Sequence, residues 1–294
     1  MISKEPKLTV LQSFSNDAAA KVITLGRVVR NYRRAHFFEG QKRFNHFLNI
    51  AKLYLSQNWK GSLPSSDESQ RIEVREGYFL HKSNRIPSLN LAVETKELTI
   101  ERNTQTKRII VSDFDDTIIK SRATSLTRLI LTTLFKPIGK REVFPEVSSF
   151  YKRLQGQNNL FFYISSSTWN IYPLLRGFLE HSDLPQGILL LKEMKLGSKP
   201  QETTLKHSHK LEKIQSLIDF YDDLPFILIG DAGQEDRQIY QRIAELNPGR
   251  IEVILIRHKW WERIMEKENE TSKASGTKLI YFNNLNDIQD LPLD

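Results

Sequence analysis

The sequence contains no cysteine among its 294 residues. This absence excludes a disulfide framework, a thiolate-bound zinc or iron–sulfur site and a cysteine nucleophile, and it suits a reducing compartment. Long apolar runs are also missing, since the stretches 187–191 and 225–229 are far shorter than the roughly 18 residues that a membrane-spanning helix needs. Residues 1–21 hold no continuous apolar segment, so we expect no secretory signal. With 39% hydrophobic and 27% charged residues, the composition predicts a folded cytoplasmic protein.

Acidic residues are scarce in the first part of the chain. Residues 1–105 hold 17 Lys and Arg against 10 Asp and Glu, and within 21–60 Glu39 is the single acid beside nine basic residues. In 31–47 basic residues alternate with aromatic ones, as they do on nucleic-acid-binding and membrane-interface surfaces. A solvated basic face over buried aromatics would give the same pattern. We expect an anionic phospholipid or membrane surface as the partner, contacted peripherally, with nucleic acid as the alternative.

The hydrophobic pattern changes at about residue 105. Alternating stretches at 21–30, 71–81 and 88–102 predict strands, and 41–57 has apolar residues at helical spacing, so we expect a β-rich basic accessory domain over 1–105 with one amphipathic helix. Over 106–294, short apolar strands alternate with helical patterns. This alternation predicts an α/β fold, a Rossmann-like parallel sheet with helices on both faces. The expected strands are 108–112, 160–164, 187–191, 225–229 and 251–256, and the expected helices 144–154, 169–181, 209–221 and 234–245.

The first of these strands ends in the acidic segment V-S-D-F-D-D-T (111–117). Asp113 and Asp115 are two residues apart, so in an extended chain their side chains point the same way. Two such carboxylates repel each other unless a cation lies between them. With a metal ion bound, one can act as nucleophile and the other as general acid–base. A turn capped by Asp116 and Thr117 is the structural alternative, but three acids and a threonine exceed what capping requires.

Two other strands also end in polar segments. Residues 165–167 are serines, whose hydroxyls can bind a phosphate beside backbone N–H groups, although serine is also an ordinary helix cap. The segment G-D-A-G-Q-E-D (230–236) offers Asp231 with Glu235 or Asp236, and Mg²⁺ prefers such oxygen ligands, whereas a capped glycine turn would need fewer acids. Ligands of open parallel sheets bind where the strand order reverses. If strand 225–230 lies beside strand 108–113, Asp231 faces Asp113 and Asp115.

In this order, the three segments resemble the haloacid dehalogenase-like phosphohydrolases over about residues 105–260. Lys210, between the second and third segments, matches the lysine of that superfamily. Residues 163–179, 184–192 and 226–240 more closely resemble the phosphatidate phosphatase catalytic domain of the actin-patch-protein type. The chain departs from that family at Thr168, where Pro is expected, and at Ala232 and Arg237, where Ser and Pro are usual. None of these departures removes a catalytic group.

The resemblance implies a Mg²⁺-dependent phosphomonoester hydrolase that converts phosphatidate to diacylglycerol and phosphate. It implies that Asp113 attacks phosphorus to form an aspartyl-phosphate and that Asp115 acts as general acid–base. The implied metal ligands are Asp113, Asp115 and Asp231, with Glu235 or Asp236 beside them. The implied phosphate-binding residues are Thr117, Ser165, Ser166 and Lys210, the last also catalytic because its ammonium neutralises charge between nucleophile and phosphoryl group.

Two alternatives remain at this stage. Residues 118–141 hold six basic residues and no acid, with leucines at helical spacing, and such a helix can lie on an anionic membrane or pack on the sheet with its charges in water. A basic chain would also attract a soluble phosphomonoester or a nucleic-acid end as substrate. A non-catalytic module that binds anionic lipid on the same fold is the second alternative.

Overall fold

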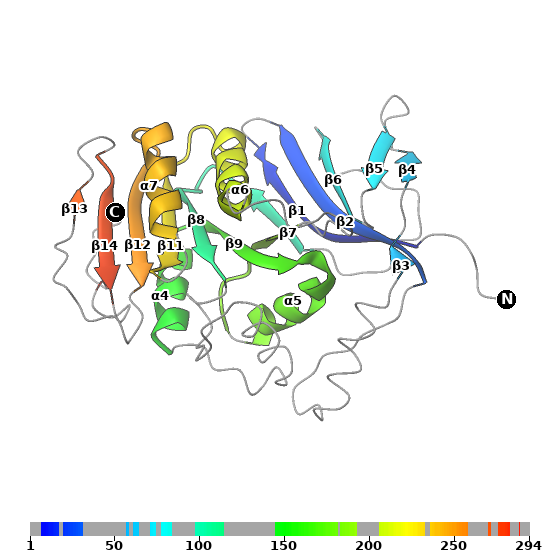
Figure 1. Ribbon diagram of the computed structural model, residues 1–294, viewed down its shortest axis with the longest axis horizontal. Helices are drawn as coiled ribbons and strands as arrows, with labels where there is room; N and C mark the ends of the chain where they lie inside the picture. The colour runs from blue at the N-terminus through cyan, green and yellow to red at the C-terminus, as the bar shows by residue number, and fades with distance from the viewer. Residues whose placement is uncertain are drawn as a thin grey trace.

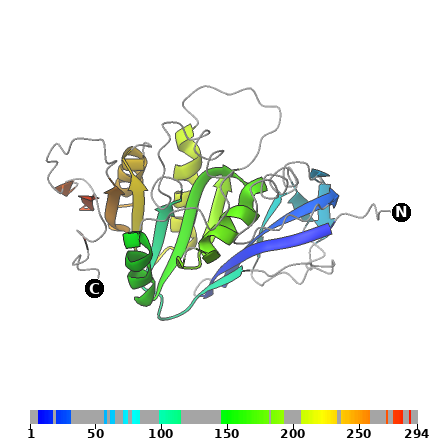
Figure 2. The ribbon, with the colours of Figure 1, turned by 90° about the horizontal axis from the view of Figure 1, so that it is seen from below.

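The described residues of the computed structural model form two large β-sheets that lie side by side and one small two-stranded sheet, with helices flanking the second large sheet (Figures 1 and 2). It describes residues 7–17, 20–31, 57–58, 61–64, 71–74, 78–83, 98–114, 145–181, 183–192, 206–232, 236–257, 270–271, 276–282 and 288. The helix expected at 118–141 lies outside these residues, as does the one expected at 41–57 except for its last residue, Gln57, which lies in a strand. No helix in the described ranges is long and apolar enough to cross a membrane.

The N-terminal region is β-rich, as its sequence predicts. Its main sheet has the order β3-β2-β1-β7, with β6 also paired to β2, and all pairs are antiparallel except β1 with β7. The stretch 71–81 was predicted as one strand, which is wrong, because β5 pairs with β4 in a separate two-stranded sheet while β6 joins the main one. The strands are β1 (Lys7–Asn16), β2 (Lys21–Asn31), β3 (Gln57–Asn58), β4 (Gly61–Pro64), β5 (Arg71–Val74), β6 (Tyr78–Ser83) and β7 (Leu98–Arg102).

The second sheet has the order β10-β9-β8-β11-β12-β14-β13, and every neighbouring pair is parallel except β13 with β14. This confirms the predicted α/β fold class. The chain proceeds from β8 to β9 and β10 on one side and then returns to β11, β12 and β14 on the other. The strands are β8 (Arg108–Asp113), β9 (Asn159–Thr168), β10 (Ile188–Lys192), β11 (Phe226–Asp231), β12 (Ile251–Arg257), β13 (Glu270–Thr271) and β14 (Lys278–Phe282).

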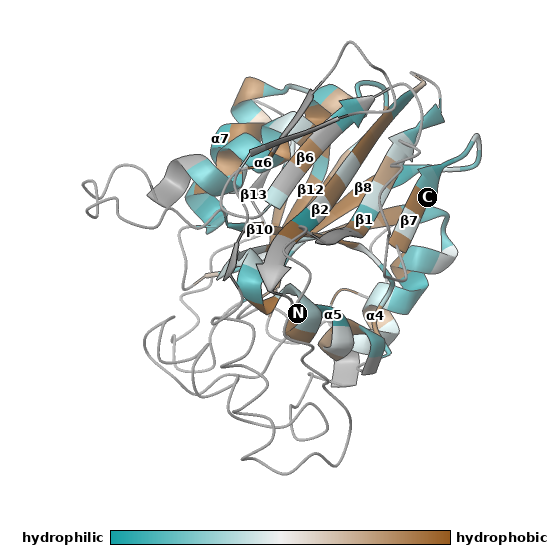
Figure 3. Ribbon diagram, turned by 90° about the vertical axis from the view of Figure 1, so that its right-hand side faces the viewer, coloured by the Kyte–Doolittle hydropathy of each residue, from teal (hydrophilic) through white to brown (hydrophobic). Residues whose placement is uncertain are grey.

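Helices cover both faces of this sheet. Figures 1 and 3 show α6 (Lys206–Phe220) and α7 (Asp236–Leu246) on one face, and α4 (Pro145–Gly156) and α5 (Tyr172–His181) on the other. A strand covered on both faces has no side exposed to water, so its sequence is continuously apolar rather than alternating. All six residues of β8 and of β11 are buried accordingly, and apolar residues run along β8 in Figure 3.

Strand β9 is longer than its sequence predicts. It was expected to end at Ile164, but it continues to Thr168. Pairing with β8 ends at Ile164, which lies opposite Asp113, whereas pairing with β10 resumes after an irregularity at Thr168, opposite Lys192. The serines at 165–167 therefore lie within the irregular end of the strand rather than after it. The expected helix at 169–181 begins with a 3₁₀ turn, η3 (Trp169–Ile171), before α5.

The N-terminal sheet closes one edge of the second sheet. The amide of Gln12 accepts a hydrogen bond from the backbone N–H of Leu189 (3.0 Å) and donates to the backbone carbonyl of the same residue (2.5 Å). Leu189 lies in β10, the edge strand, whose outward backbone groups would otherwise remain unpaired. The register of β1 shifts between Val10 and Gln12, and such bulges re-aim the side chains that follow. One side chain thus takes the place of a neighbouring strand at this position.

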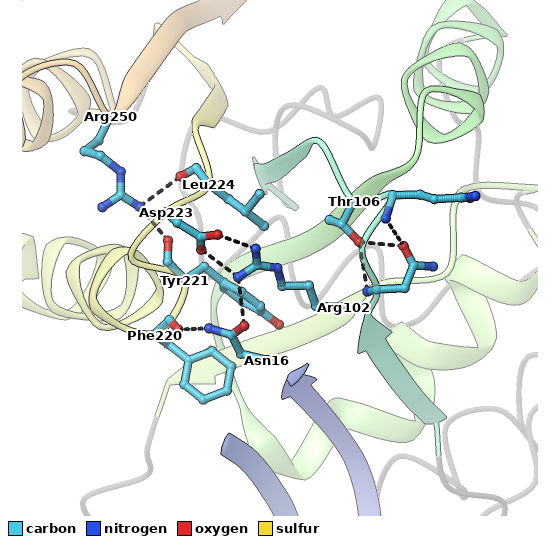
Figure 4. Close-up of polar contacts among 10 residues, drawn as sticks. Asn16, Arg102, Thr106, Phe220, Tyr221, Asp223, Leu224 and Arg250 are labelled. Carbon is cyan, nitrogen blue, oxygen red and sulfur yellow. Dashed lines mark hydrogen bonds and ion pairs between the residues drawn. The ribbon is translucent and has the colours of Figure 1, made fainter. Parts of the chain in front are cut away.

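A second polar contact lies where β7 meets the turn after α6 (Figure 4). Arg102 makes a two-pronged ion pair with Asp223 and also donates to Asn16 Oδ1 at 2.8 Å. Asn16 in turn donates to the backbone carbonyl of Phe220 at 2.6 Å. The hydrogen bond from Arg102 lowers the pKa of Asp223, so both groups stay charged. Arg102 therefore links β1, β7 and α6.

Apolar and aromatic side chains complete the contact between the two sheets. The ring of Phe14 packs edge-on against Phe162 and Phe220, with centroids 5.2 and 5.3 Å apart, and it belongs to the same buried cluster as the second sheet. Nearby, Tyr78, Trp169 and Tyr172 stack in series at 5.8 and 5.7 Å. Arg27 covers the outer ring at one end of this series and Arg176 at the other. The two regions share one core, although the predicted boundary at 105/106 stays a prediction.

Candidate functional site

The predicted site lies at the carboxyl ends of β8 and β11. The two strands are adjacent and parallel, with Ile229 of β11 opposite Ser112 of β8, which confirms the predicted neighbourhood of the two segments. Asp113 and Asp231 end these strands, and each side chain is 1% exposed. The strand order reverses between β8 and β11, because later strands lie beyond β11 on one side and β9 and β10 on the other. This is the position at which open parallel sheets bind ligands.

Lys210 connects this edge to α6. Its Nζ donates to Asp113 Oδ1 at 2.8 Å and also pairs with Asp236 Oδ1. Burial alone lowers the pKa of Lys210, but the carboxylates of Asp113 and Asp236 outweigh that effect and hold the pKa well above its usual value. The ammonium is therefore charged at neutral pH. The resemblance to the haloacid dehalogenase-like phosphohydrolases implied that this lysine acts beside Asp113, and the geometry places the two in direct contact.

Asp236 is the first residue of α7 and is fully enclosed. Its Oδ2 accepts a hydrogen bond from the backbone N–H of Asp231 at 3.3 Å. Burial raises its pKa well above the usual range, and the nearby charges of Asp113 and Asp231 raise it further, although Lys210 opposes them. Two buried carboxyl groups, those of Asp113 and Asp236, thus share one ammonium, and a third, that of Asp231, lies close enough to affect the pKa of Asp236. Such an excess of acid favours either a bound proton or an additional cation.

Gly230 leaves room for Asp236, and Tyr240 joins α7 to β11. Neither residue was singled out from the sequence. A Cβ on Gly230 would come within 2.5 Å of Asp236 Oδ2 and 2.8 Å of the Tyr240 ring, so only glycine fits between β11 and α7. Tyr240 lies four residues after Asp236 on α7 and donates to the carbonyl of Ile229 at 3.3 Å. Residues four apart on a helix lie on the same face, so the spacing of Asp236 and Tyr240 could have indicated that Tyr240 lies near the site.

The described carboxylates fit one part of a divalent-cation site. Asp113 Oδ2 is buried and accepts no hydrogen bond from any described residue, so the oxygen is available to a cation. Asp231 supplies a second buried carboxylate on the adjacent strand. Asp115 and Glu235, two further expected ligands, lie outside the described residues. Among the described ranges alone, no group of three or more His, Cys, Asp or Glu side chains forms a metal centre.

The predicted phosphate-binding serines sit on β9, next to β8. Ser165 is fully buried, and its Oγ accepts a hydrogen bond from the backbone N–H of Ser167 at 3.0 Å. Ser166 is exposed, so its hydroxyl faces solvent at the same strand end. Thr117 lies outside the described residues. The structure therefore brings Asp113, Lys210, Asp231 and Asp236 to one strand edge, with the serine segment following the neighbouring strand of that sheet.

Comparison with known proteins agrees with this arrangement. Residues 108–258, from the start of β8 to just after β12, match the family model of the phosphatidate phosphatase APP1 catalytic domain. The chain belongs to that family. The match spans every described residue of the site and confirms the resemblance found from the motifs. Phosphatidate phosphatase APP1 of Saccharomyces cerevisiae is 31% identical over 152 residues, and an uncharacterized protein of Schizosaccharomyces pombe is 28% identical over 168 residues.

These matches cover only part of each relative. They include 50% and 57% of this chain, but 25% of the budding-yeast protein and 28% of the fission-yeast protein. A solved structure of a HAD family hydrolase from Salmonella enterica serovar Typhi is similar over 74% of this chain and 86% of its own, with 10% identity and a TM-score of 0.30. At that TM-score the likeness supports no conclusion, and the fold assignment here rests on the strand order.

Proposed function

We propose that the protein is a phosphoric monoester hydrolase in which Asp113 is the nucleophile. The observation that carries this proposal is the contact of a buried lysine, Lys210, with a buried aspartate at the end of β8, 2.8 Å apart, in a chain of the phosphatidate phosphatase APP1 family. Phosphoryl transfer requires little more than accurate placement and stabilisation of charge. A carboxylate and an ammonium fixed on rigid elements supply both.

The proposed reaction has two steps. In the first, the Asp113 carboxylate attacks phosphorus and the ester oxygen leaves, so a carboxyl–phosphoryl bond forms as the ester bond breaks. Asp115 donates a proton to the departing alkoxide. In the second, Asp115 removes a proton from water, which attacks the aspartyl-phosphate and regenerates Asp113. Lys210 stabilises the negative charge between the nucleophile and the phosphoryl group, and Ser165, Ser166 and Thr117 bind its oxygens.

Asp113 and Asp231 would hold a Mg²⁺ ion together with Asp115 and either Glu235 or Asp236. A bound Mg²⁺ would neutralise the phosphoryl oxygens and the excess of carboxylates. Asp236 serves a different purpose in the described geometry, because both of its oxygens are already engaged, one by Lys210 and the other by the backbone N–H of Asp231. We therefore assign Asp236 to the placement of Lys210, and Glu235 to the metal ion.

Phosphatidate is the proposed substrate, with diacylglycerol and phosphate as the products. The support is the family match together with the excess of basic residues over 1–105 and 118–141, which favours an anionic membrane surface as the place of action. We propose a cytoplasmic enzyme that binds such a surface peripherally. A soluble phosphomonoester, a nucleic-acid end and a purely lipid-binding role are the alternatives that the experiment must separate.

Phosphate release from the full chain tests the proposal. We expect release from vesicles that contain phosphatidate when Mg²⁺ is present, and none after its removal with a chelator. Lysophosphatidate, a sugar phosphate and a phosphorylated oligonucleotide form the comparison panel. If phosphate were released only from the sugar phosphate or the oligonucleotide, phosphatidate would not be the substrate, but the proposed hydrolysis of a phosphomonoester would stand. If no substrate released phosphate but vesicles still bound the chain, the lipid-binding alternative would stand instead.

A further inference from the structure

A buried hydrogen-bond relay leads from α4 to the backbone of the proposed nucleophile. Ser112 Oγ donates to the backbone carbonyl of Asp113 at 2.8 Å, and the hydroxyl of Tyr151 lies 2.7 Å from the same Ser112 oxygen. A serine hydroxyl has a single proton, which here goes to the carbonyl, so Tyr151 is the donor to Ser112. Both side chains are completely buried. Burial raises the pKa of Tyr151, so its proton stays in place.

The relay acts where ordinary strand pairing stops. The last paired residues of β8 are Asp113 with Ile164 of β9, and Ser112 with Ile229 of β11. The next residue, Phe114, no longer belongs to the strand, and the carbonyl of Asp113 lies where the pairing of β8 with β11 has already ended. The Ser112 hydroxyl donates a hydrogen bond to this carbonyl in place of a backbone N–H of the sheet. The orientation of that peptide sets the backbone dihedrals of Asp113 and hence the direction of its carboxylate.

The next residue is fixed as well. The backbone N–H of Phe114 donates to the carbonyl of Ile164 at 2.9 Å, and its buried ring packs edge-on against Tyr163 and Phe178 at 6.0 and 5.7 Å. The peptide between Asp113 and Phe114 is thus held at both of its polar atoms, by Ser112 on the carbonyl and by Ile164 on the N–H. On the other side, Lys210 holds Asp113 Oδ1.

We propose that Ser112 and Tyr151 are positioning residues that orient the Asp113 peptide, and through it the nucleophilic carboxylate, for phosphoryl transfer. The proposal rests on the proposed function, since it assigns them a part in that reaction. Neither residue touches the substrate. Small misplacements of a reacting group reduce the rate of the chemical step more than they weaken binding of the ground state. Loss of the relay should therefore lower kcat and leave KM nearly unchanged.

The test uses Ser112→Ala, Tyr151→Phe and the double variant in the full chain. Each single change is expected to lower kcat roughly tenfold, with KM changed less than twofold. Because the two hydroxyls form one relay, the double variant should be no slower than the slower single variant, whereas independent effects would multiply. Multiplying effects, or a kcat within twofold of the unaltered chain in Ser112→Ala, would overturn the proposal.

Tyr163→Phe is the matched control. It removes another buried tyrosine hydroxyl, which donates to the carbonyl of Pro185 at 2.9 Å, while it keeps the ring that Phe114 contacts. We expect this variant to keep the original kcat. If its kcat fell as much as that of Tyr151→Phe, the effect of Tyr151→Phe would reflect a general loss of stability, and the proposal would be overturned.

Amide hydrogen exchange at Phe114 gives a second readout that needs no activity. In Ser112→Ala, exchange at this amide should rise about tenfold relative to that of Ile110 within the same strand. If the unaltered chain released no phosphate, the proposed function would fail, and the exchange rate at Phe114 would decide alone whether the relay orders this peptide. An unchanged rate would overturn the proposal in either case.

Discussion

Lys210 Nζ lies 2.8 Å from Asp113 Oδ1, and the same nitrogen pairs with Asp236. One ammonium from α6 therefore joins the end of β8 to the first residue of α7. The three side chains are at most 9% exposed, so water screens their charges little. Removing the cation would leave two buried carboxyl groups without the charge that they share. The stability of this strand edge and the proposed chemistry depend on the same contact.

Lys210→Met should reduce both stability and activity. Breaking a buried ion pair from one side costs about 3–5 kcal/mol of unfolding free energy. Phosphate release should fall at least roughly a hundredfold. Urea unfolding and phosphate release measure the two effects. Lys213→Met is the matched control, because Lys213 is on the same helix and donates to the backbone carbonyl of Leu191. An active Lys210→Met chain would contradict the role given to Lys210.

Asp113→Asn should abolish turnover and keep the fold. The amide has nearly the same shape as the carboxylate but cannot attack phosphorus to give a stable acyl phosphate, so a loss on the order of 10⁴-fold is expected. Phosphate release measures this, and circular dichroism checks the fold. Asp183→Asn changes an exposed aspartate paired with Lys152 and should leave the rate unaltered. Full activity of Asp113→Asn would remove Asp113 as the nucleophile.

Gly230→Ala should damage the site through packing alone. The added methyl group would overlap Asp236 Oδ2 and the Tyr240 ring, and overpacking of this kind costs about 1–3 kcal/mol. Because Asp236 holds Lys210, phosphate release should fall as well. Gly156→Ala provides the comparison, since its methyl group would meet no atom within 4 Å other than those of its chain neighbours and its own helix backbone. Thermal unfolding measures the stability of both variants, and Gly230→Ala should have the lower melting temperature. Equal melting temperatures would refute the packing argument.

His209 should make stability fall in mild acid. Burial, assisted by Lys213, Lys192 and Lys210, lowers its pKa from 6.5 to about 4. Between these values the unfolded chain binds a proton that the folded chain does not, so the unfolding free energy contributed by this group decreases as pH falls from 6.5 toward 4. Chemical denaturation at pH 7 and pH 5 measures the difference. In His209→Gln this part of the pH dependence should disappear; an identical dependence would show that His209 is not its source.

Gln12→Leu should destabilise the contact between the two sheets. The change leaves the backbone N–H and carbonyl of Leu189 without their partners on a buried edge strand, which costs about 3 kcal/mol. Unpaired strand edges also promote association between chains. Urea unfolding and light scattering report the two effects. Gln155→Leu, at an exposed position of α4, should change neither, and a wild-type unfolding curve for Gln12→Leu would contradict this account.

Much of the second sheet could be predicted from the sequence because parallel strands covered on both faces are short apolar runs. The rule that ligands bind where the strand order reverses then brought Asp113 and Asp231 together without any coordinate. Contacts between residues far apart in sequence lay beyond that reasoning. The relay from Tyr151 to Ser112 and the two hydrogen bonds between Gln12 and Leu189 depend on how α4 and β1 pack, which no local sequence pattern encodes. The extension of β9 through Thr168 was missed because three serines resemble a turn.

The stack of Tyr78, Trp169 and Tyr172 gives the molecule an optical signal of its own. An indole enclosed between two phenol rings, with guanidinium groups at both ends, emits differently from one surrounded by solvent. If the first sheet moved away from η3, Trp169 would lose Tyr78 and its emission would shift to the red. In a chain whose other three tryptophans are replaced by phenylalanine, the emission wavelength of Trp169 would therefore report whether the two sheets remain in contact.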